Sequence, residues 1–588
     1  MIRQTLTAAA LLAAFTAPAA AQDVIEIGRR NGVEAPAWIR RELARNPSAF
    51  EFRHAWKPDL RRVQEARARL AARGIDARAV PTRTAARYEA AVSGVYRVPT
   101  LTVLFANTPA EPYPYTDLQA RLYDGPSATL TLSGFYDEMS RGVFDLRGTV
   151  FPWVRLSQPD TYYEGTENGS VPELGELIAE AVDSLDATVD FSIYDRNADG
   201  KVDFIAIIHP EPGGECRTEN IWSHRWTYSS ASGTGAPLPT DDGVVIEDYV
   251  IQPAFDCDGA TPVPIGVFAH EFGHALGLPD LYATDYSNGG IDLWGLMGAG
   301  NYNRPESPAH LSAYSKSVLG WIPVVTVDAD TTGVALEDAA TTGVAIRIDI
   351  PAAATSNVEY FLLENRQGGG SDRYVRGTGL LIWHVDSTVI ANRSPTNTVQ
   401  NDANHKGLDL EEADGLAEID MADAGIVVAD AGDPFPGTRG NTVFDDATNP
   451  AASAYGGLTS GIRIANIVES GGTVSFDVTF GTAGERIAYW GDVDGDGAVT
   501  RDDAQAVFEA LLRATGGDLT LGDVDADGDT DARDGLIIQS YAEGVDVSGF
   551  RVGQPAEGMA VRRPAPARIR ADGASRRIPV ANRRTGGL

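Results

Sequence analysis

The pattern of hydrophobic and polar positions divides the chain into a mixed first part and a β-rich second part. Residues 36–73 are rich in Ala, Leu, Arg and Glu, and the tract at 60–66 is typical of an amphipathic helix. The pattern changes to that of a strand at 95–105. Farther along, residues 174–185 predict a helix, and the apolar run at 201–209 predicts a buried strand.

Short apolar runs separated by Gly, Asp and Asn follow between residues 323 and 480. The runs at 344–350, 379–385 and 473–480 have the spacing of strands in a β-sandwich-like module. Because 588 residues exceed what one hydrophobic core usually supports, several domains are expected. The predicted fold class is therefore multidomain α+β.

A chemical motif lies before the β-rich part, in the sequence HEFGHALGLPD from His270 to Asp280. Residues four apart share one face of a helix, so His270 and His274 can bind one Zn²⁺ while Glu271 points at its open position. Gly277 permits a sharp turn that brings Asp280 back as a third ligand. Zinc lowers the pKa of a bound water to about 7, and Glu271 can act as the general base that takes its proton. The weaker interpretation is an ordinary helix with two surface histidines.

The N-terminus has the features of a secretory signal peptide over residues 1–21, because Arg3 precedes an apolar stretch that ends in three alanines. No later segment offers about twenty uninterrupted apolar residues, so no transmembrane segment is expected. The protein is predicted to be secreted, with attachment to a cell surface left open. Export makes the only two cysteines, Cys216 and Cys257, candidates for a disulfide; the alternative is two free thiols.

The net charge of -34 argues against nucleic acid as a partner. Both ends depart from this acidic average, since residues 29–88 and 562–584 are rich in arginine. Part of the negative charge is concentrated in short Asp-rich loops, which are typical of cation sites.

Two of these loops form an internal duplication, 31 residues apart. Each places acids at loop positions 1, 3, 5 and 12 and glycine at position 6, which suits the six to eight oxygen ligands of Ca²⁺. Helical runs follow at 504–512 and 535–541. The predicted calcium ligands are Asp492, Asp494, Asp496, Thr500, Asp503, Asp523, Asp525, Asp527, Asp531 and Asp534.

An aspartate rather than a glutamate at position 12 resembles type I dockerins. This resemblance implies a cohesin-type docking partner, and the alternatives are a purely intramolecular stabilising role or an acidic linker. A third segment, with Asp195, Asn197, Asp199 and Asp203, lacks the acid at position 12. It is interpreted equally well as a calcium loop or as a turn that leads into a strand.

The zinc motif and its surroundings resemble the immune inhibitor A family of secreted bacterial metalloproteases. The similar segments cover about residues 90 to 480, and they are 203–209, 221–226, 278–282, 293–298, 314–321, 360–366, 383–386 and 411–415. The resemblance implies a zincin-like catalytic domain, an N-terminal propeptide and an endopeptidase that acts on protein substrates. It implies His270, His274 and Asp280 as zinc ligands and Glu271 as the base. Met297 would form a hydrophobic floor below the metal.

Some assignments near the motif have alternatives. Proteases with a bare HExxH motif take a distant glutamate as third ligand, and Glu306 lies within reach in the sequence. Tyr302 is a weak candidate for stabilising the oxyanion. The remaining histidines singled out, namely His209, His224, His310 and His384, are interpreted as hydrogen-bonded structural residues.

The predicted organisation has six parts: signal peptide 1–21, propeptide 22–90, catalytic domain 91–322, β-rich domain 323–482, dockerin-like duplication 488–546, and a basic, disordered tail 547–588. The predicted function is a secreted zinc endopeptidase tethered through its calcium-binding module. The alternatives are a non-catalytic binding or scaffold protein with a protease fold, and a zinc hydrolase of a non-protein substrate.

Overall fold

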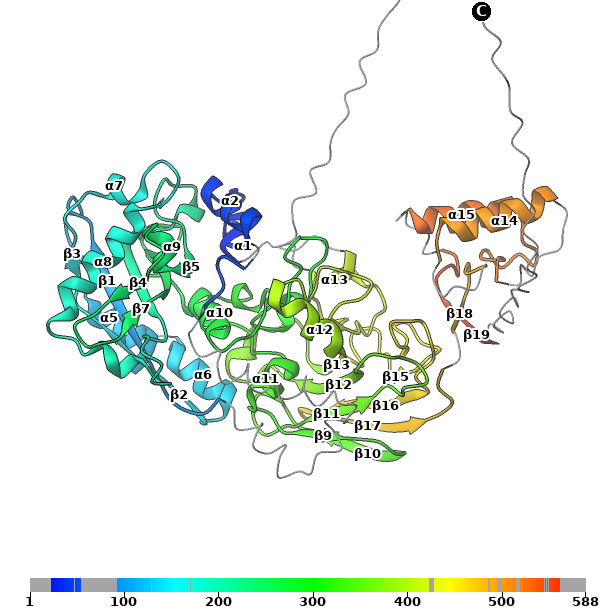
Figure 1. The fold of residues 1–588 in the computed structure, drawn as a ribbon. Coiled ribbons are helices and arrows are strands. Elements are labelled where there is room, and N and C mark those ends of the chain that lie inside the picture. Colours follow the sequence, from blue (N-terminus) through cyan, green and yellow to red (C-terminus); the bar gives the residue numbers. More distant parts are fainter. Residues whose placement is uncertain are drawn as a thin grey trace, which may run out of the picture. The chain divides into compact units, whose positions relative to one another are not determined.

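The computed structural model describes residues 23–46, 48–53, 92–127, 129–169, 171–421, 428–484, 487–493, 499–513, 519, 521–543, 545, 547 and 549–560. The chain forms two compact units, Met1–Gly484 (unit 1) and Glu485–Leu588 (unit 2), which we describe separately (Figure 1). The predicted signal peptide and the amphipathic tract at 60–66 lie outside the described residues.

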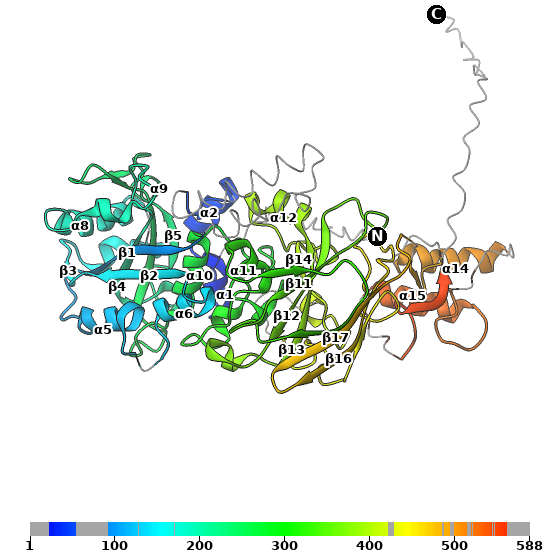
Figure 2. The ribbon, with the colours of Figure 1, turned by 90° about the horizontal axis from the view of Figure 1, so that it is seen from below.

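The first half of unit 1 is built on a six-stranded sheet in which β2, β1, β4, β8 and β5 are neighbours in this order and β3 pairs with β1 (Figure 2). Strands β2, β1, β4 and β8 run parallel, and β5 lies antiparallel to β8 at the edge. The strands are β1 Gly94–Leu104, β2 Phe144–Val150, β3 Val154–Arg155, β4 Ile205–Pro212, β5 His224–Thr227 and β8 Asp248–Phe255. A small hairpin, β6 Leu238–Pro239 and β7 Val245–Ile246, lies outside this sheet.

Side-chain alternation along β4 and β8 gives the sheet two buried faces. Ile208 and Val250 face one core, which also contains Phe268 and Phe272 of α10 (Ile265–Ala275). The opposite face shares a core with Leu177 of α8 (Glu173–Asp186). The helix that carries the motif is thus packed directly on the sheet.

Helices cover both faces and the connections. The further helices of unit 1 are α1 Asp23–Arg30, α2 Ala37–Arg45, α5 Tyr115–Gln119, α6 Leu132–Ser140, α7 Asp160–Glu164, α9 Tyr228–Ala231, α11 Ala313–Leu319, α12 Ser387–Arg393 and α13 Glu418–Met421. The helix predicted at 174–185 is confirmed by α8, and the strand predicted at 95–105 is confirmed by β1.

The strand predicted at 201–209 begins later than expected, at Ile205. The amide of Val202 donates to Val245 O (2.9 Å) and that of Asp203 donates to Tyr194 O (2.9 Å). These amides are therefore used by neighbouring loops, and the regular ladder with β8 starts only after them. Hydrophobicity alone does not show this competition for backbone partners.

The second half of unit 1 contains two stacked sheets. A five-stranded sheet has the order β14-β13-β12-β11-β9, and a four-stranded sheet has the order β10-β17-β16-β15. Apolar side chains from both sheets, such as Phe361, Ile382 and Phe476, form one core, as in a sandwich. The strands are β9 Val324–Thr326, β10 Thr331–Leu336, β11 Ala345–Asp349, β12 Glu359–Arg366, β13 Gly379–Asp386, β14 Leu408–Leu410, β15 Val443–Phe444, β16 Ile462–Ser470 and β17 Thr473–Phe480.

The three strands predicted in this half are confirmed as β11, β13 and β17. The five-stranded sheet also contributes Leu362 and Trp383 to the core that contains Phe268. Residues on both sides of the predicted boundary at 322/323 therefore pack into one continuous core. The motif helix lies between the mixed sheet and this sheet.

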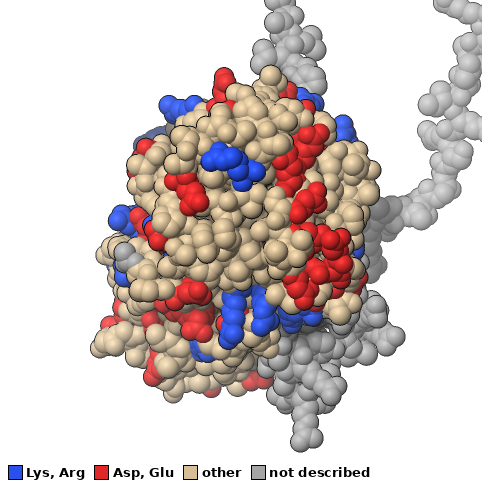
Figure 3. Space-filling model, turned by 90° about the vertical axis from the view of Figure 1, so that its left-hand side faces the viewer, with Lys and Arg blue, Asp and Glu red and all other residues tan. Residues whose placement is uncertain are grey.

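Acidic side chains form the larger charged patches on the end of unit 1 that carries α7 and α8 (Figure 3). On α8, Glu176 and Asp183 are exposed, and the buried positions between them are apolar. No helix of the described chain has the length and apolar character needed to cross a bilayer. The predicted disulfide between Cys216 and Cys257 is confirmed.

Unit 2 packs helices α14 Arg501–Arg513 and α15 Ala532–Ala542 around a small core and adds a two-stranded sheet, β18 Ile487–Tyr489 and β19 Pro555–Ala560. The two helical runs predicted here are confirmed. The prediction of a disordered tail from 547 onward is wrong for residues 549–560, because Val552 belongs to the core and β19 pairs with β18. Residues 561–588 lie outside the described part.

Candidate metal centre

The motif residues lie on one buried helix. His270, Glu271 and His274 of α10 are 2%, 3% and 0% exposed. Met297, also fully buried, packs against the helix at Gly273, where an added Cβ would lie 2.4 Å from its sulfur. Met297 therefore lies against the helix turn between the two histidines, and its role as a hydrophobic floor below a metal stays a prediction.

Three ligand atoms converge next to this helix. The distances are 3.1 Å from His270 Nε2 to Asp280 Oδ1, 3.1 Å from His270 Nε2 to His274 Nε2, and 3.2 Å from His274 Nε2 to Asp280 Oδ1. A point equidistant from three such atoms can lie as close as about 1.8 Å to each, which is shorter than the zinc–ligand bonds of about 2.0–2.1 Å. All three can therefore bind one zinc ion at normal distances.

The other ring nitrogen of each histidine is fixed by a backbone carbonyl. His270 Nδ1 donates to Leu296 O (2.8 Å), and His274 Nδ1 donates to Leu278 O (2.8 Å). These bonds select the tautomer in which Nε2 carries the lone pair for a metal. The donor set is thus oriented by neighbouring backbone.

Asp280 is held by two features of the chain. The chain turns after the helix at Gly277, as predicted, and this glycine adopts a left-handed conformation with φ +85°. Asn397 then clamps Asp280 from 117 residues away: its Oδ1 accepts from Asp280 N (3.0 Å) and its Nδ2 donates to Asp280 Oδ2. The alternative ligand Glu306 pairs with Arg304 instead (3.4 Å) and belongs to none of the ligand groups within the described residues.

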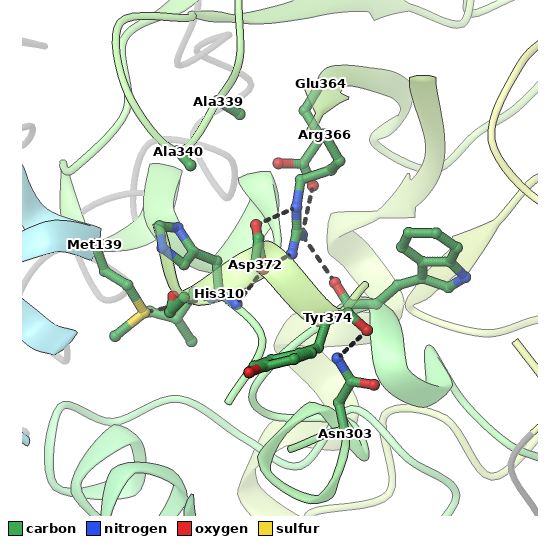
Figure 4. Close-up of polar contacts among 12 residues, drawn as sticks. Met139, Asn303, His310, Ala339, Ala340, Glu364, Arg366, Asp372 and Tyr374 are labelled. Atoms are coloured by element: carbon green, nitrogen blue, oxygen red, sulfur yellow. Dashed lines mark hydrogen bonds and ion pairs between the residues drawn. The ribbon is translucent and has the colours of Figure 1, made fainter. Parts of the chain in front are cut away.

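A buried ion pair supports the loop that carries Leu296 (Figure 4). Arg366 donates to both carboxylate oxygens of Asp372 (2.8 and 2.7 Å) and to Trp294 O (3.0 Å). Asp372 also accepts from the amide of His310 (2.9 Å), whose carbonyl accepts from Leu296 N (3.0 Å). Burial raises the pKa of Asp372, but the charge of Arg366 outweighs it and holds the pKa at about 2.

Glu271 has a cationic neighbour that the motif does not reveal. Arg225 Nη1 donates to Glu271 Oε2 (2.6 Å), and both side chains are almost fully buried. Arg225 Nη2 also lies 3.5 Å from Glu51 Oε1. The one hint in the sequence is a charged residue between the aromatic residues of β5. This pair orients the Glu271 carboxylate.

The N-terminal segment covers the centre. Helices α1 and α2 lie beside β5 and α10 (Figures 1 and 2). Ile27 of α1 lines a cavity of about 10 Å³ together with His270, Glu271 and Tyr302. The indole of Trp222 donates to Val24 O.

Further contacts hold this segment against β5 and the loop after α10. The rings of Trp38 and Trp226 pack at a tilted angle with centroids 5.1 Å apart, and the Phe50 ring lies 5.3 Å from that of Trp226. The Arg30 guanidinium lies 4.0 Å from the centroid of the Tyr302 ring. Residues of the predicted propeptide thus close the site from solvent.

Three of the other histidines have the predicted structural roles. His224 Nε2 bonds Tyr249 Oη (2.8 Å), His310 Nε2 bonds Glu138 Oε1 (2.7 Å), and His384 lies between Glu359 and Glu411. His209 differs, because neither ring nitrogen has a hydrogen-bond partner among the residues the structure describes. Burial lowers the pKa of His209 to about 3, so this ring stays neutral.

In the first calcium loop, Asp503 closes the loop from position 12. Its Oδ1 accepts from Val493 N (2.8 Å) and its Oδ2 accepts from Thr500 N (2.7 Å). Asp492 and Asp503 are fully buried. The other predicted ligands of this loop, Asp494 and Asp496, lie outside the described residues.

The second loop repeats these bonds: Asp534 Oδ1 accepts from Val524 N (2.8 Å), and its Oδ2 accepts from Asp531 N (2.9 Å). Carboxylate oxygens converge in two overlapping groups, Asp523 with Asp525 and Asp534, and Asp529 with Asp531 and Asp534. Asp529 was not among the predicted ligands. The predicted ligand Asp527 joins neither group.

Two further acidic groups lie in unit 1. In the segment from Asp195 to Asp203, Asp195 accepts from the amides of Asp199 (3.1 Å) and Gly200 (2.9 Å), which describes a turn. Four carboxylates of the β-rich half converge without having been predicted, namely Glu412, Asp414, Glu418 and Asp433. Burial and the charge of Asp433 raise the pKa of Glu412 to about 9.

Comparison with known proteins agrees with this geometry. Residues 115–322 match the family "Immune inhibitor A peptidase M6, catalytic domain", and residues 490–542 match the "Dockerin type I domain". The chain therefore contains a peptidase M6 domain, which is a metallopeptidase domain, and a type I dockerin domain.

Two curated relatives are similar to part of this chain. Immune inhibitor A of Bacillus thuringiensis subsp. alesti is 33% identical over 254 residues, which are 36% of this chain and 36% of the relative. Pre-pro-metalloprotease PrtV of Vibrio cholerae serotype O1 (strain M66-2) is 30% identical over 245 residues, 36% of this chain and 26% of the relative. The matched part is thus about a third of each relative or less.

Proposed function

We propose that this protein is a secreted zinc-dependent endopeptidase that hydrolyses peptide bonds in proteins, with a zincin-like catalytic domain. The observation that carries the proposal is the convergence of His270 Nε2 and His274 Nε2, from the buried helix that also carries Glu271, with Asp280 Oδ1 from the loop after it. The peptidase M6 match over the same residues supports it. A zinc ion held by these three residues would polarise the scissile carbonyl and lower the pKa of a bound water.

The protein's own residues have distinct roles in this proposal. Glu271 accepts the proton of the attacking water and passes it to the leaving amine. Arg225 orients the Glu271 carboxylate. Leu296 O and Leu278 O fix the histidine tautomers, and Asn397 fixes Asp280.

Residues 22–90 act as a propeptide in this proposal. Its described part lies on the site as a helix, with Ile27 facing the cavity at His270 and Glu271. The backbone groups of a helix are bonded within the helix, so α1 cannot lie in the cleft as an extended substrate would. Removal of the segment would open the cleft, so we expect the full chain to be latent.

Unit 2 would bind two calcium ions and dock to a cohesin-type partner outside the cell. The proposal is supported by the type I dockerin match and by the repeated bonds of Asp503 and Asp534. Such docking would attach the enzyme to a scaffold or a cell surface.

The test is casein cleavage by zinc-loaded protein from which the N-terminal segment has been removed. Wild type should cleave, chelation should stop cleavage, and zinc should restore it. Glu271→Ala should be inactive while it still binds one zinc ion per chain. An inactive wild type with one bound zinc would contradict the endopeptidase proposal and would favour a binding protein or a hydrolase of another substrate.

A further inference from the structure

The strand next to the metal centre carries one polar side chain on an otherwise apolar face. Side chains alternate along β8, so Val250, Gln252 and Ala254 point to the same side. Val250 and Ala254 belong to the core that contains the motif helix. Gln252 is 1% exposed, and neither its Oε1 nor its Nε2 has a hydrogen-bond partner in the described part of the chain. A buried amide without hydrogen-bond partners lowers the stability of the folded protein, so we expect a ligand to supply the missing partners.

Asn301 presents a second such group. It is 3% exposed, and its Oδ1 has no hydrogen-bond partner among the described residues. Close packing fixes its backbone, because a Cβ at Gly266 would lie 2.4 Å from Asn301 O. Gly266 lies one helical turn before His270, so Asn301 is held firmly against the motif helix.

Both amides line the cavity at the reacting groups. Gln252, Asn301, His270 and Glu271 surround the same space of about 10 Å³, which suffices for one water molecule. Ile27 of the N-terminal segment lines this space as well. The larger volume that a substrate needs would become available when α1 leaves.

We propose that Gln252 and Asn301 hydrogen-bond the main chain of the substrate beside the scissile bond after the N-terminal segment has been removed. This inference rests on the proposed peptidase function. An extended peptide presents N–H and C=O groups without partners of their own, and a side-chain amide can both donate to and accept from them. Recognition of the main chain positions the scissile carbonyl without requiring a particular side chain, so these residues favour broad selectivity for extended polypeptides.

The test compares Gln252→Met and Asn301→Leu with wild type, each freed of the N-terminal segment. Methionine and leucine keep the approximate size of the amides but cannot replace their hydrogen bonds. We expect kcat/KM for an internally quenched peptide to fall by about tenfold or more in each variant, mainly through a higher KM. Zinc content should remain one ion per chain.

A structural role for the amides would give a different result. In the full chain, Gln252→Met should leave Tm unchanged or raise it, because the amide has no protein partner to lose. The matched control is Val250→Ala on the same strand face, which should lower Tm and leave kcat/KM within about twofold of wild type. A Tm loss for Gln252→Met as large as that of Val250→Ala would overturn the inference, as would kcat/KM values close to wild type in both amide variants.

A binding measurement separates this inference from the proposed function. The affinity of a casein-derived peptide for the opened, zinc-loaded Glu271→Gln protein is measured by calorimetry, with and without Gln252→Met. Weaker binding by about tenfold in the double variant would support the inference even if wild type failed to cleave casein. Equal affinity would overturn it even if wild type proved to be an active peptidase.

Discussion

The two regions proposed to bind metals, the zinc centre in unit 1 and the calcium loops in unit 2, arrange their candidate ligands in opposite ways. In unit 1, two of the three candidate ligands are held by partners far along the chain: Leu296 O accepts from His270, and Asn397 binds Asp280 across 117 residues. In unit 2, each loop is closed by its own last residue, such as Asp534, which binds the amide of Val524 ten residues earlier. The first site is therefore a product of the whole fold, whereas each calcium site is a product of one segment.

The difference predicts which region depends on its metal for folding. The zinc ligands are supported by a large core that contains the motif helix. The predicted calcium loops bring several carboxylates together over a small core whose buried members are Ala504, Val507, Val524, Ile537, Ile538 and Val552. So small a core contributes little stability, and like charges oppose folding until a cation neutralises them.

The largest expected effect is therefore the loss of unit 2 when calcium is removed. With a calcium-selective chelator, we expect the calorimetric transition of unit 2 to disappear and the transition of unit 1 to remain. Adding calcium back should restore the unit 2 transition. If this transition persisted without calcium, the folding of unit 2 would not depend on its metal, and the contrast with unit 1 would be wrong.

Zinc removal should abolish activity but leave unit 1 folded, in contrast to calcium removal from unit 2. Chelation of zinc should abolish peptide cleavage, while unit 1 keeps a cooperative transition, lowered by about 10 °C or less. Near-ultraviolet circular dichroism would report whether the aromatic packing around α10 survives. Loss of the unit 1 transition would show that the zinc site also depends on its ion for folding.

A smaller effect is expected from the clamp on Asp280. Asn397→Ala removes both bonds to this ligand, and loss of such supporting bonds lowers metal affinity by about 10- to 100-fold. The measurement is competition with a zinc chelator of known affinity. Asn404→Ala, at an exposed position of the same region, serves as the control. Equal zinc affinity in both variants would show that the turn at Gly277 alone positions Asp280.

The same contrast explains what the sequence could and could not predict. The convergence of His270, His274 and Asp280, the turn at Gly277 and the closure of the two twelve-residue loops by Asp503 and Asp534 all follow from local spacing, so the sequence could predict them. That these groups bind zinc and calcium stays a prediction. The partners of these groups are distant: Arg225 lies 46 residues from Glu271, and nothing local marks Asn397 as a partner of Asp280. These contacts depend on how strands and loops meet in the fold.

Strand pairing was also beyond local patterns. Residues 549–560 fall within the tail predicted to be disordered, but β19 pairs with β18 from the other end of unit 2. Gln252 shows the reverse case, since one polar residue in an apolar strand was visible in the sequence. Its meaning became clear only when the structure placed it at the cavity beside His270 and Glu271.

The smallest expected effect is on the pH dependence of Tm. This dependence should differ between the two units, because all eight histidines precede residue 406 and none lies in unit 2. Burial lowers the pKa of His384, but hydrogen bonds to Glu359 and Glu411 and their charges outweigh it and raise the pKa to about 9. A raised pKa stabilises the folded protein below the unfolded value of about 6.5 and loses this effect as pH rises through 9. The Tm of unit 1 should therefore fall by a few degrees between pH 6.5 and 9, and His384→Gln should reduce that fall. The calcium-loaded unit 2 should keep its Tm over this range, and an equal fall in both units would show that His384 is not its source.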